Sequence, residues 1–462
     1  MKIAKTMTFV RIGVLSGLLA CAFAAHGKDF NVKDYGAKGD GATSDTGAIQ
    51  KAIDAAAKGG GGRVVVPAGT YLSGSLFVKS HVELALTSGS TILGSQNITD
   101  YPMMPTRVAG IEMTWPAALV NVYAQTDAKI TGKGSIDGNG KIFWQSFWTT
   151  RARYEPKGLR WAADYDAKRP RLIQIFKSSK VELSGLALKR SGFWTVDICY
   201  SQNVTVAGIT INNNIDGKGP STDGIDIDSS RHILVEHTDI TVNDDALCLK
   251  AGRDSDGLRV NHPTEDVVLR DSVVRAGAAG VTIGSETSGG FRNIEAYRIK
   301  VLAPVPNGIL FKSARTRGGW TDGIRIHDID LVNVPVVIHV TLNWNPSYSY
   351  ATLPDGMTNV PDYWKVLTTP VSEQRGLAHF RNVWLSSIHA TGAKKAFEVS
   401  AYPNAPLENF HLSAIQIEAQ TAGMIANAAN WTLTNVHVKT LDGTRIQFKD
   451  DSAIKCTNSS CE

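Results

Sequence analysis

The sequence predicts an all-β protein, folded as a right-handed, single-stranded parallel β-helix. Three observations lead to this prediction: a short alternating phrase that returns along the chain, the absence of a 3.6-residue apolar period through those phrases, and 43 glycines in 462 residues. Alternating apolar and polar residues are typical of strands with one buried face. Because one such unit cannot bury that face alone, stacked units must form a solenoid.

The repeated phrase is clearest in the middle of the chain. It begins at Val181 as VELSGLAL and recurs every 23 to 34 residues, with insertions between the copies. An immunoglobulin-like sandwich would need hairpin-length turns, so the longer returns favour a coil of several strands per turn. The further copies start at Val204, Ile233, Val267, Ile294 and Ile324, and weaker ones at Phe410 and Trp431.

A helix is predicted over 46–58, where TGAIQKAIDAAAK places Ile49, Ile53 and several alanines on one face. It is well placed to cover the N-terminal end of the solenoid, which would otherwise be open. We expect residues 28–462 to form a single β-helix domain. Segments 102–163, rich in Trp and Tyr, and 343–363 are interpreted as insertions that rim a groove.

The first 24 residues are predicted to be a cleaved signal peptide. Lys2, Lys5 and Arg11 form a basic segment before an apolar run, 12–25, that is too short to span a bilayer, and Ala22-Phe23-Ala24 fits a small-x-small cleavage site. We therefore expect a secreted or periplasmic protein without a membrane span. The alternative is a lipoprotein signal, Leu18-Leu19-Ala20-Cys21, which would attach lipid to Cys21.

Removal of those three basic residues lowers the formal net charge from +5 to +2, which gives no indication of nucleic-acid binding. Among the five cysteines, Cys199 and Cys248 lie in strand-like apolar runs and are predicted to be buried. Cys456 and Cys461 could close a small disulfide loop in an oxidising compartment. No Cys/His spacing indicates zinc.

Three carboxylates are candidates for chemistry. Asp223 lies in STDGID, and the adjacent pair Asp244-Asp245 lies in NDDALCLK, about one coil further along the chain. Since neighbouring coils stack roughly 4.8 Å apart, we expect the three to share one outer face. Like charges this close raise the pKa of at least one carboxyl, and glycoside hydrolysis requires such a combination of acid and base. Other acids of this region are interpreted as turn residues: Asp226, Asp228, Asp239, Asp254 and Asp256.

Four phrases, STDGIDID, NDDALCLKAGRD, AAGVTIGSETSGG and NGILFKSARTRGG, occur in this order and resemble glycoside hydrolase family 28, the polygalacturonases and their relatives. The resemblance covers nearly the whole mature chain and implies a pectin-lyase-like β-helix. It also implies hydrolysis of α-linked galacturonic acid in pectin with inversion, without a metal or cofactor. By position, Asp244 matches the general acid, and Asp223 and Asp245 match the pair that activates water.

The sequence departs from the family pattern at three places. Ser221 stands where the first motif has Asn, Ala278-Ala279 where the third has Gly-His, and Leu310-Phe311-Lys312 where the fourth has Arg-x-Lys. These differences leave the substrate open between galacturonan, with possible exo-action, and rhamnogalacturonan. In either case we expect a pectic polysaccharide as partner and a monomeric enzyme.

Galacturonan carries one carboxylate per sugar, so a binding groove should supply cations. Lys312 is the first candidate by family match, followed by residues on loops after the strands with the aspartates: Lys250, Arg253, Arg315 and Arg317. Glu286 is a candidate for binding sugar hydroxyls or orienting an arginine. Trp344, Tyr348 and Tyr350 are interpreted as packing residues of a rim loop.

Two other functions are compatible with parts of the sequence. A polysaccharide lyase on the same scaffold would use the aspartates to bind Ca²⁺ and an Arg or Lys as base. A non-catalytic β-helix that binds polysaccharide would need no acid at all. The four ordered phrases disfavour the first alternative, and the retained Asp223, Asp244 and Asp245 disfavour the second.

Overall fold

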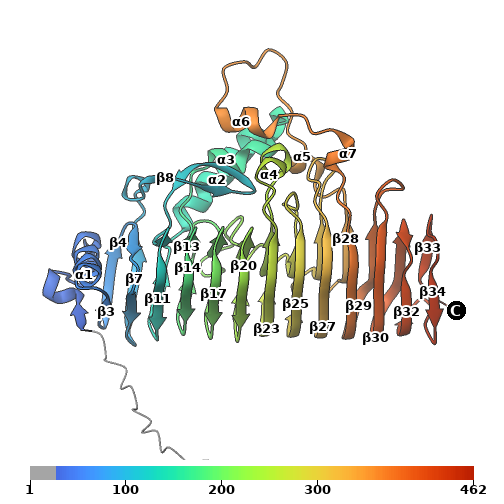
Figure 1. Ribbon diagram of the computed structural model, residues 1–462, viewed down its shortest axis with the longest axis horizontal. Coiled ribbons are helices and arrows are strands. Elements are labelled where there is room, and N and C mark those ends of the chain that lie inside the picture. The colour runs from blue at the N-terminus through green and yellow to red at the C-terminus, as the bar shows by residue number, and fades with distance from the viewer. Residues whose placement is uncertain (1–27, 462) are drawn as a thin grey trace, which may run out of the picture.

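The predicted fold is confirmed: in the computed structural model, residues 28–461 are described and form a right-handed parallel β-helix (Figure 1). Thirty-two strands join one continuous sheet, in which neighbouring coils pair in parallel. Among the described residues, antiparallel pairing of strands is confined to the hairpin of β8 (Met103–Val108) and β9 (Ile111–Pro116).

The repeated phrases form one column of stacked strands. Val181, Val204, Ile233, Val267, Ile294 and Ile324 are consecutive partners in the ladder. Their strands are β14 (Ser179–Ser184), β17 (Gln202–Ala207), β20 (Arg231–Glu236), β23 (Thr264–Ala276), β25 (Phe291–Leu302) and β27 (Thr321–Val332). These apolar residues point inward and are almost fully buried, so the column forms one wall of the core.

The sequence reading missed one copy of the repeat. Val383 in β29 (Arg381–Ser400) pairs with Ile324 on one side and with Phe410 of β30 (Leu407–Ala426) on the other. A long excursion that leaves and rejoins the β-helix separates Ile324 from Val383 in the chain, and this gap hides the periodicity. The stacking continues to Trp431, whose ring lies 4.6 Å from that of Phe410.

The two ends of the β-helix are closed differently. Helix α1 (Thr46–Lys58) has the predicted bounds and covers the N-terminal end, with Ile49, Ala52, Ile53 and Ala56 fully buried (Figure 1). Near the C-terminal end Cys456 and Cys461 form a disulfide. Cys199 and Cys248 are buried free thiols, as predicted.

The predicted signal peptide and Cys21 lie outside the described residues. Within 28–461, no helix combines the length and apolar character needed to cross a membrane.

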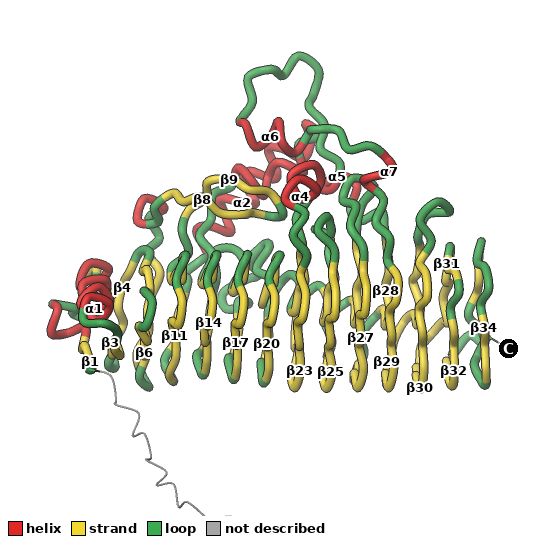
Figure 2. Tube along the Cα trace, in the orientation of Figure 1, coloured by secondary structure: helices red, strands yellow, loops and turns green. Residues whose placement is uncertain are grey.

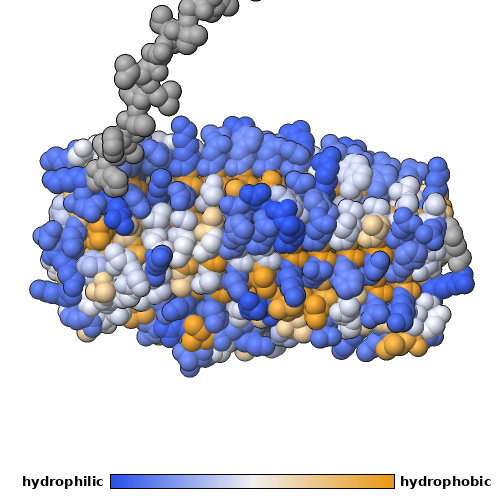
Figure 3. Space-filling model, turned by 90° about the horizontal axis from the view of Figure 1, so that it is seen from below, coloured by the Kyte–Doolittle hydropathy of each residue, from blue (hydrophilic) through white to orange (hydrophobic). Residues whose placement is uncertain are grey.

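The insertions collect on one side of the β-helix, over its middle coils (Figures 1 and 2). They contain the β8–β9 hairpin and the helices α2 (Lys141–Tyr154), η4 (Arg160–Ala162), α3 (Ala163–Asp166), α4 (Asp254–Val260), α5 (Pro346–Ser349), α6 (Asp362–Leu367) and α7 (Glu373–Gly376). Their apolar cluster includes Trp115, Trp161 and Trp364, and it also contains Trp194 of the β-helix. The opposite face of the molecule is mostly hydrophilic, with apolar residues in narrow bands (Figure 3).

Candidate active site

The three candidate aspartates lie on adjacent coils beneath the insertions. Strand β19 (Ile225–Asp228) pairs with β22 (Leu247–Lys250), and the register joins Ile225 to Leu247. Residues that lie opposite each other on these two coils are therefore 22 apart in the sequence. Asp223 and Asp244 are only 21 apart, so Asp223 lies opposite Asp245. The Gly224 backbone N donates to the Asp245 carbonyl at 2.8 Å.

The predicted grouping of the aspartates is confirmed. Asp223, Asp244 and Asp245 each offer a carboxylate oxygen within 4.8 Å of the others. Ile225, Ile227, Leu247 and Leu249 point inward and are buried. Asp223 and Asp245 are also buried, at 3% and 1% exposure, whereas Asp244 is partly exposed.

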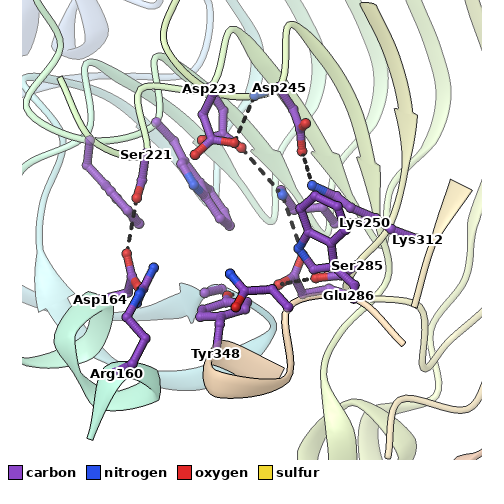
Figure 4. A pocket seen from close by; sticks show the side chains of 16 residues that line it. Arg160, Asp164, Ser221, Asp223, Asp245, Lys250, Ser285, Glu286, Lys312 and Tyr348 are labelled. Carbon is purple, nitrogen blue, oxygen red and sulfur yellow. Dashed lines mark hydrogen bonds and ion pairs between the residues drawn. The ribbon is translucent and has the colours of Figure 1, made fainter. Parts of the chain in front are cut away.

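The aspartates line a cavity of about 130 Å³, shown in Figure 4. The β-helix contributes Phe193, Trp194, Ser221, Lys250, Ser285, Glu286 and Lys312 besides the three aspartates. The first insertion contributes Ala109, Arg160 and Asp164, and the rim loop contributes Trp344, Asn345 and Tyr348. Both predicted insertions therefore do form walls of the site.

Two carboxyls of the cluster, those of Asp244 and Asp223, have raised pKa values. Burial and the neighbouring Asp245 carboxylate raise the pKa of Asp244 to about 6, against the opposing effects of Lys312 and Lys250. Burial, Asp226 and Asp244 raise the pKa of Asp223 well above its ordinary value. Asp245 instead accepts a 2.6 Å hydrogen bond from the Lys312 ammonium. Asp244 thus faces the cavity as a carboxyl that keeps its proton in mildly acidic solution.

Lys250 is a counter-ion in the floor of the site. Its Nζ lies 3.5 Å from Asp223 Oδ2, 3.4 Å from Asp226 Oδ1 and 3.4 Å from Glu286 Oε2. The side chain is only 5% exposed and its ammonium lies 4.8 Å from the centre of the Trp194 ring. Lys250 lines the cavity as predicted, but three protein carboxylates already surround its charge.

The interpretation of Asp226 as a turn residue is wrong. Asp226 is fully buried in β19, and its carboxylate makes an ion pair with Lys250. Burial raises the pKa of Asp226 well above its ordinary value. The alternation in IDID carries the relevant signal, because it places Asp226 on the outward side of the strand, in register with Asp197 of the preceding coil.

Three more of those acids are also paired with arginines rather than free in turns. Asp228 binds Arg107 at 3.0 Å, Asp254 binds Arg253 at 3.0 Å, and Asp256 binds Arg259 at 2.7 Å. Asp239 alone among the five is a surface residue, and it pairs with Arg275.

The structure separates the predicted substrate-binding residues into two groups. Lys312, Lys250 and Glu286 line the cavity, whereas Arg253, Arg315 and Arg317 do not. Arg253 and Arg317 are fully buried, because their guanidinium groups hold loops together: Arg253 donates to the Tyr348 carbonyl at 2.8 Å, and Arg317 to the Ser285 carbonyl at 3.1 Å. Arg315 is exposed and packs over the Tyr402 ring.

Glu286 is held as an anion. Lys250, Arg317, Lys312 and Arg253 surround it and lower its pKa to about 2, despite burial, which acts in the opposite direction. The Tyr348 hydroxyl donates to its Oε1 at 3.2 Å. Tyr348 and Trp344, interpreted from sequence as packing residues, therefore belong to the wall of the site.

Sequence reasoning missed Arg160 and Asp164, which the first insertion brings to the cavity. Arg160 donates to Asp164 at 2.7 Å, and Asp164 accepts a 3.0 Å hydrogen bond from the hydroxyl of Ser221. Ser221 is the residue that departs from the family pattern. Its short side chain is thus engaged by the insertion, two residues before Asp223.

No histidine fills the place of Ala279. Ala279 is fully buried next to Asp245 in the ladder, where its carbonyl accepts from the Ala246 backbone N at 3.0 Å. None of the residues lining the cavity is a histidine. Asp244 therefore depends on burial and on Asp245, rather than on an imidazole, for its raised pKa.

Comparison with known proteins identifies the family of this chain. The sequence model of the glycosyl hydrolases family 28 matches residues 61–358. The chain is 30% identical to a probable polygalacturonase of Vitis vinifera over 72% of its own length, and 28% identical to an exo-poly-alpha-D-galacturonosidase of Dickeya chrysanthemi over 69%. It spans 66% and 57% of the length of these two relatives. Endo-polygalacturonases also match.

Among solved structures, the chain is similar to a hyperthermoactive exopolygalacturonase from Thermotoga maritima. The TM-score is 0.72 at 25% identity, and the alignment covers 94% of this chain and 92% of the other.

Proposed function

Since this chain belongs to family 28 of the glycosyl hydrolases, we propose that it hydrolyses α-galacturonosidic bonds of pectin by acid–base catalysis, releasing short products from a chain end. The observation that carries this proposal is the cluster of Asp223, Asp244 and Asp245 at a cavity, with one carboxyl partly exposed and of raised pKa. Such a group supplies a proton, and a carboxylate beside it can accept one.

In the proposed reaction Asp244 donates its proton to the glycosidic oxygen as the bond from the anomeric carbon breaks. A water molecule bound by Asp223 and Asp245 attacks that carbon and gives its proton to Asp245, the member of the pair that accepts a hydrogen bond from the Lys312 ammonium. One carboxylate oxygen from each aspartate lies within 4.8 Å of the other two, which is closer than the roughly 6.5–9.5 Å usual between the carboxyls of inverting enzymes. Inversion therefore rests on family membership, and NMR of the first-formed anomer tests it.

The size and walls of the cavity support exo-action. Ligand pockets for small molecules usually measure roughly 300–1,000 Å³, so a cavity of about 130 Å³ suits one end of a chain rather than a long segment. The first insertion and the rim loop supply walls that an open groove would lack (Figure 4). Rhamnogalacturonan remains the second candidate substrate, because Ser221, Ala279 and Leu310 depart from the pattern of the galacturonan enzymes.

Product analysis on defined oligogalacturonides tests the proposal. We expect monomer or dimer to accumulate from the first minutes, with chains shortened from one end. A spread of intermediate oligomers would contradict exo-action, and cleavage of rhamnogalacturonan alone would select the second candidate. Ultraviolet-absorbing unsaturated products that disappear with a chelator would identify a Ca²⁺-dependent lyase instead.

We also propose that the enzyme acts outside the cytoplasm, as expected from the predicted signal peptide and from a polymeric substrate. N-terminal sequencing of the exported protein tests this: a start near Ala25 agrees with simple secretion, and a lipid-modified Cys21 agrees with an anchored form.

The pH dependence of the reaction should reflect the proton on Asp244. Because burial and Asp245 raise its pKa to about 6, its carboxyl is protonated below that pH and loses its proton above it. We expect kcat/KM to fall about tenfold per pH unit above roughly pH 6, which initial rates at low substrate concentration between pH 4 and 8 would show. A rate that rises through this range would contradict the role of Asp244 as acid.

A further inference from the structure

Three cations line the cavity, and they are not equally available to a ligand. Lys250 lies within 3.5 Å of three carboxylates, and Lys312 donates to Asp245 at 2.6 Å. Arg160 makes one hydrogen bond, from Nη1 to Asp164. Its Nε and Nη2 have no protein acceptor among residues 28–461.

The position of Arg160 is fixed before any ligand binds. Besides the bond to Asp164, its guanidinium lies 5.4 Å from the centre of the Tyr348 ring and 6.0 Å from that of Phe147. The side chain is 12% exposed, so the remaining donors are accessible but partly desolvated. In Figure 4 it lies on the wall opposite Lys312 and Asp245.

The charge of this wall suits an anion. Asp164 is the carboxylate between two guanidinium groups, 2.7 Å from Arg160 and 3.4 Å from Arg169. Asp164 is thus shared between Arg160, which lines the cavity, and the fully buried Arg169, which does not, so its charge does not neutralise Arg160 alone. The other side of the cavity carries Asp223, Asp244, Asp245 and Glu286 against two lysines. A carboxylate entering the cavity would be repelled by the aspartates and attracted to Arg160.

We propose that Arg160 binds the carboxylate of the galacturonosyl residue that ends the chain, and so determines specificity for an acidic terminal sugar. This inference rests on the proposed function. A guanidinium presents parallel N–H groups that match a planar carboxylate, and such charge-assisted bonds are stronger than neutral ones. The first insertion thereby both closes the cavity and supplies the group that recognises what enters it.

The test uses three trigalacturonates: the unmodified trimer, and two trimers with a methyl ester on either terminal residue. An ester removes the charge of one carboxylate and leaves the glycosidic bonds unchanged. For one of the two ends we expect the wild-type kcat/KM to fall about 10- to 100-fold on esterification, as loss of one charge-assisted hydrogen bond predicts. In Arg160→Gln that ester penalty should shrink to about threefold or less, because the unmodified trimer becomes a poorer substrate.

Two further variants sharpen the comparison. Arg160→Lys keeps the positive charge but lacks the paired N–H donors of the guanidinium, so esterification should lower its kcat/KM by an intermediate factor. Arg151→Gln makes the same chemical change on α2, where Arg151 pairs with Glu155 outside the cavity, and should keep the full penalty. An equal loss of activity on all three trimers, or no ester penalty in the wild type, would overturn the inference while the proposed function stands. A wild-type enzyme that cleaves none of the trimers would overturn both.

Discussion

Replacing Asp244 with Asn is expected to lower kcat for oligogalacturonide hydrolysis by about 10²- to 10⁴-fold, the usual contribution of a general acid. The amide has the shape of the carboxyl but no proton to give to the leaving oxygen. Its oxygen can still accept the 3.0 Å hydrogen bond from the Asp245 backbone N, so the local turn should persist. Reducing-sugar release and product chromatography measure the loss.

Loss of a charge beside Asp245 should leave folding stability unchanged or slightly higher, because Asp245 raises the pKa of Asp244 by repulsion. Thermal unfolding of the variant checks that the lost activity is not lost structure. Asp239→Asn is the matched control, since Asp239 lies on β21 (Asp239–Thr241) and pairs with Arg275 at the surface. We expect its kcat to remain within about twofold of wild type. Normal turnover by folded Asp244→Asn enzyme would remove Asp244 from the mechanism.

The β-helix could be predicted from sequence because its determinants are local. The alternation of apolar and polar residues within each strand shows which face is buried. The same pattern recurs in the stacked strands that contain Val181, Val204 and Ile233. Helix α1 could be predicted for the same reason, because all the residues of its apolar face lie within one segment of 13 residues. The repeat at Val383 was missed because the chain leaves the β-helix before it and returns at an unpredictable distance.

In the candidate site, too, residues on the repeating coils could be predicted from sequence, whereas residues on the insertion could not. Asp223, Asp244 and Asp245 lie on consecutive coils, so spacing alone brings them together, although the true register places Asp223 opposite Asp245. Arg160 and Asp164 come from an insertion whose docking no periodicity encodes. Burial also decides what a charged residue does. The sequence predicts Arg253 as a substrate-binding residue, but its buried guanidinium instead donates to the Tyr348 carbonyl and holds that loop in place.

Lys250 balances the charge of three carboxylates in the floor of the cavity, so its removal should strongly destabilise the protein. Lys250→Met should lower the free energy of unfolding at pH 7 by about 3–5 kcal/mol, the usual cost of removing one partner from a buried ion pair. The change removes the ammonium that lies within 3.5 Å of Asp223, Asp226 and Glu286. The methionine side chain fills nearly the same volume as the lysine side chain. Urea unfolding at pH 7 and pH 5 would measure it. The deficit should be smaller at pH 5, because Asp223 and Asp226, whose pKa values are already raised, can take up protons and become neutral.

Two companions separate this charge effect from simple loss of packing. Lys129→Met removes a half-exposed lysine that pairs with Glu182 at 3.4 Å, and should change stability by less than about 1 kcal/mol. Asp226→Asn combined with Lys250→Met removes one of the stranded carboxylates, so it should be more stable than Lys250→Met alone. If Lys250→Met unfolds at the same urea concentration as wild type, the three carboxylates do not depend on this ammonium. Lys250 would then be free to bind the substrate, as the sequence first predicted.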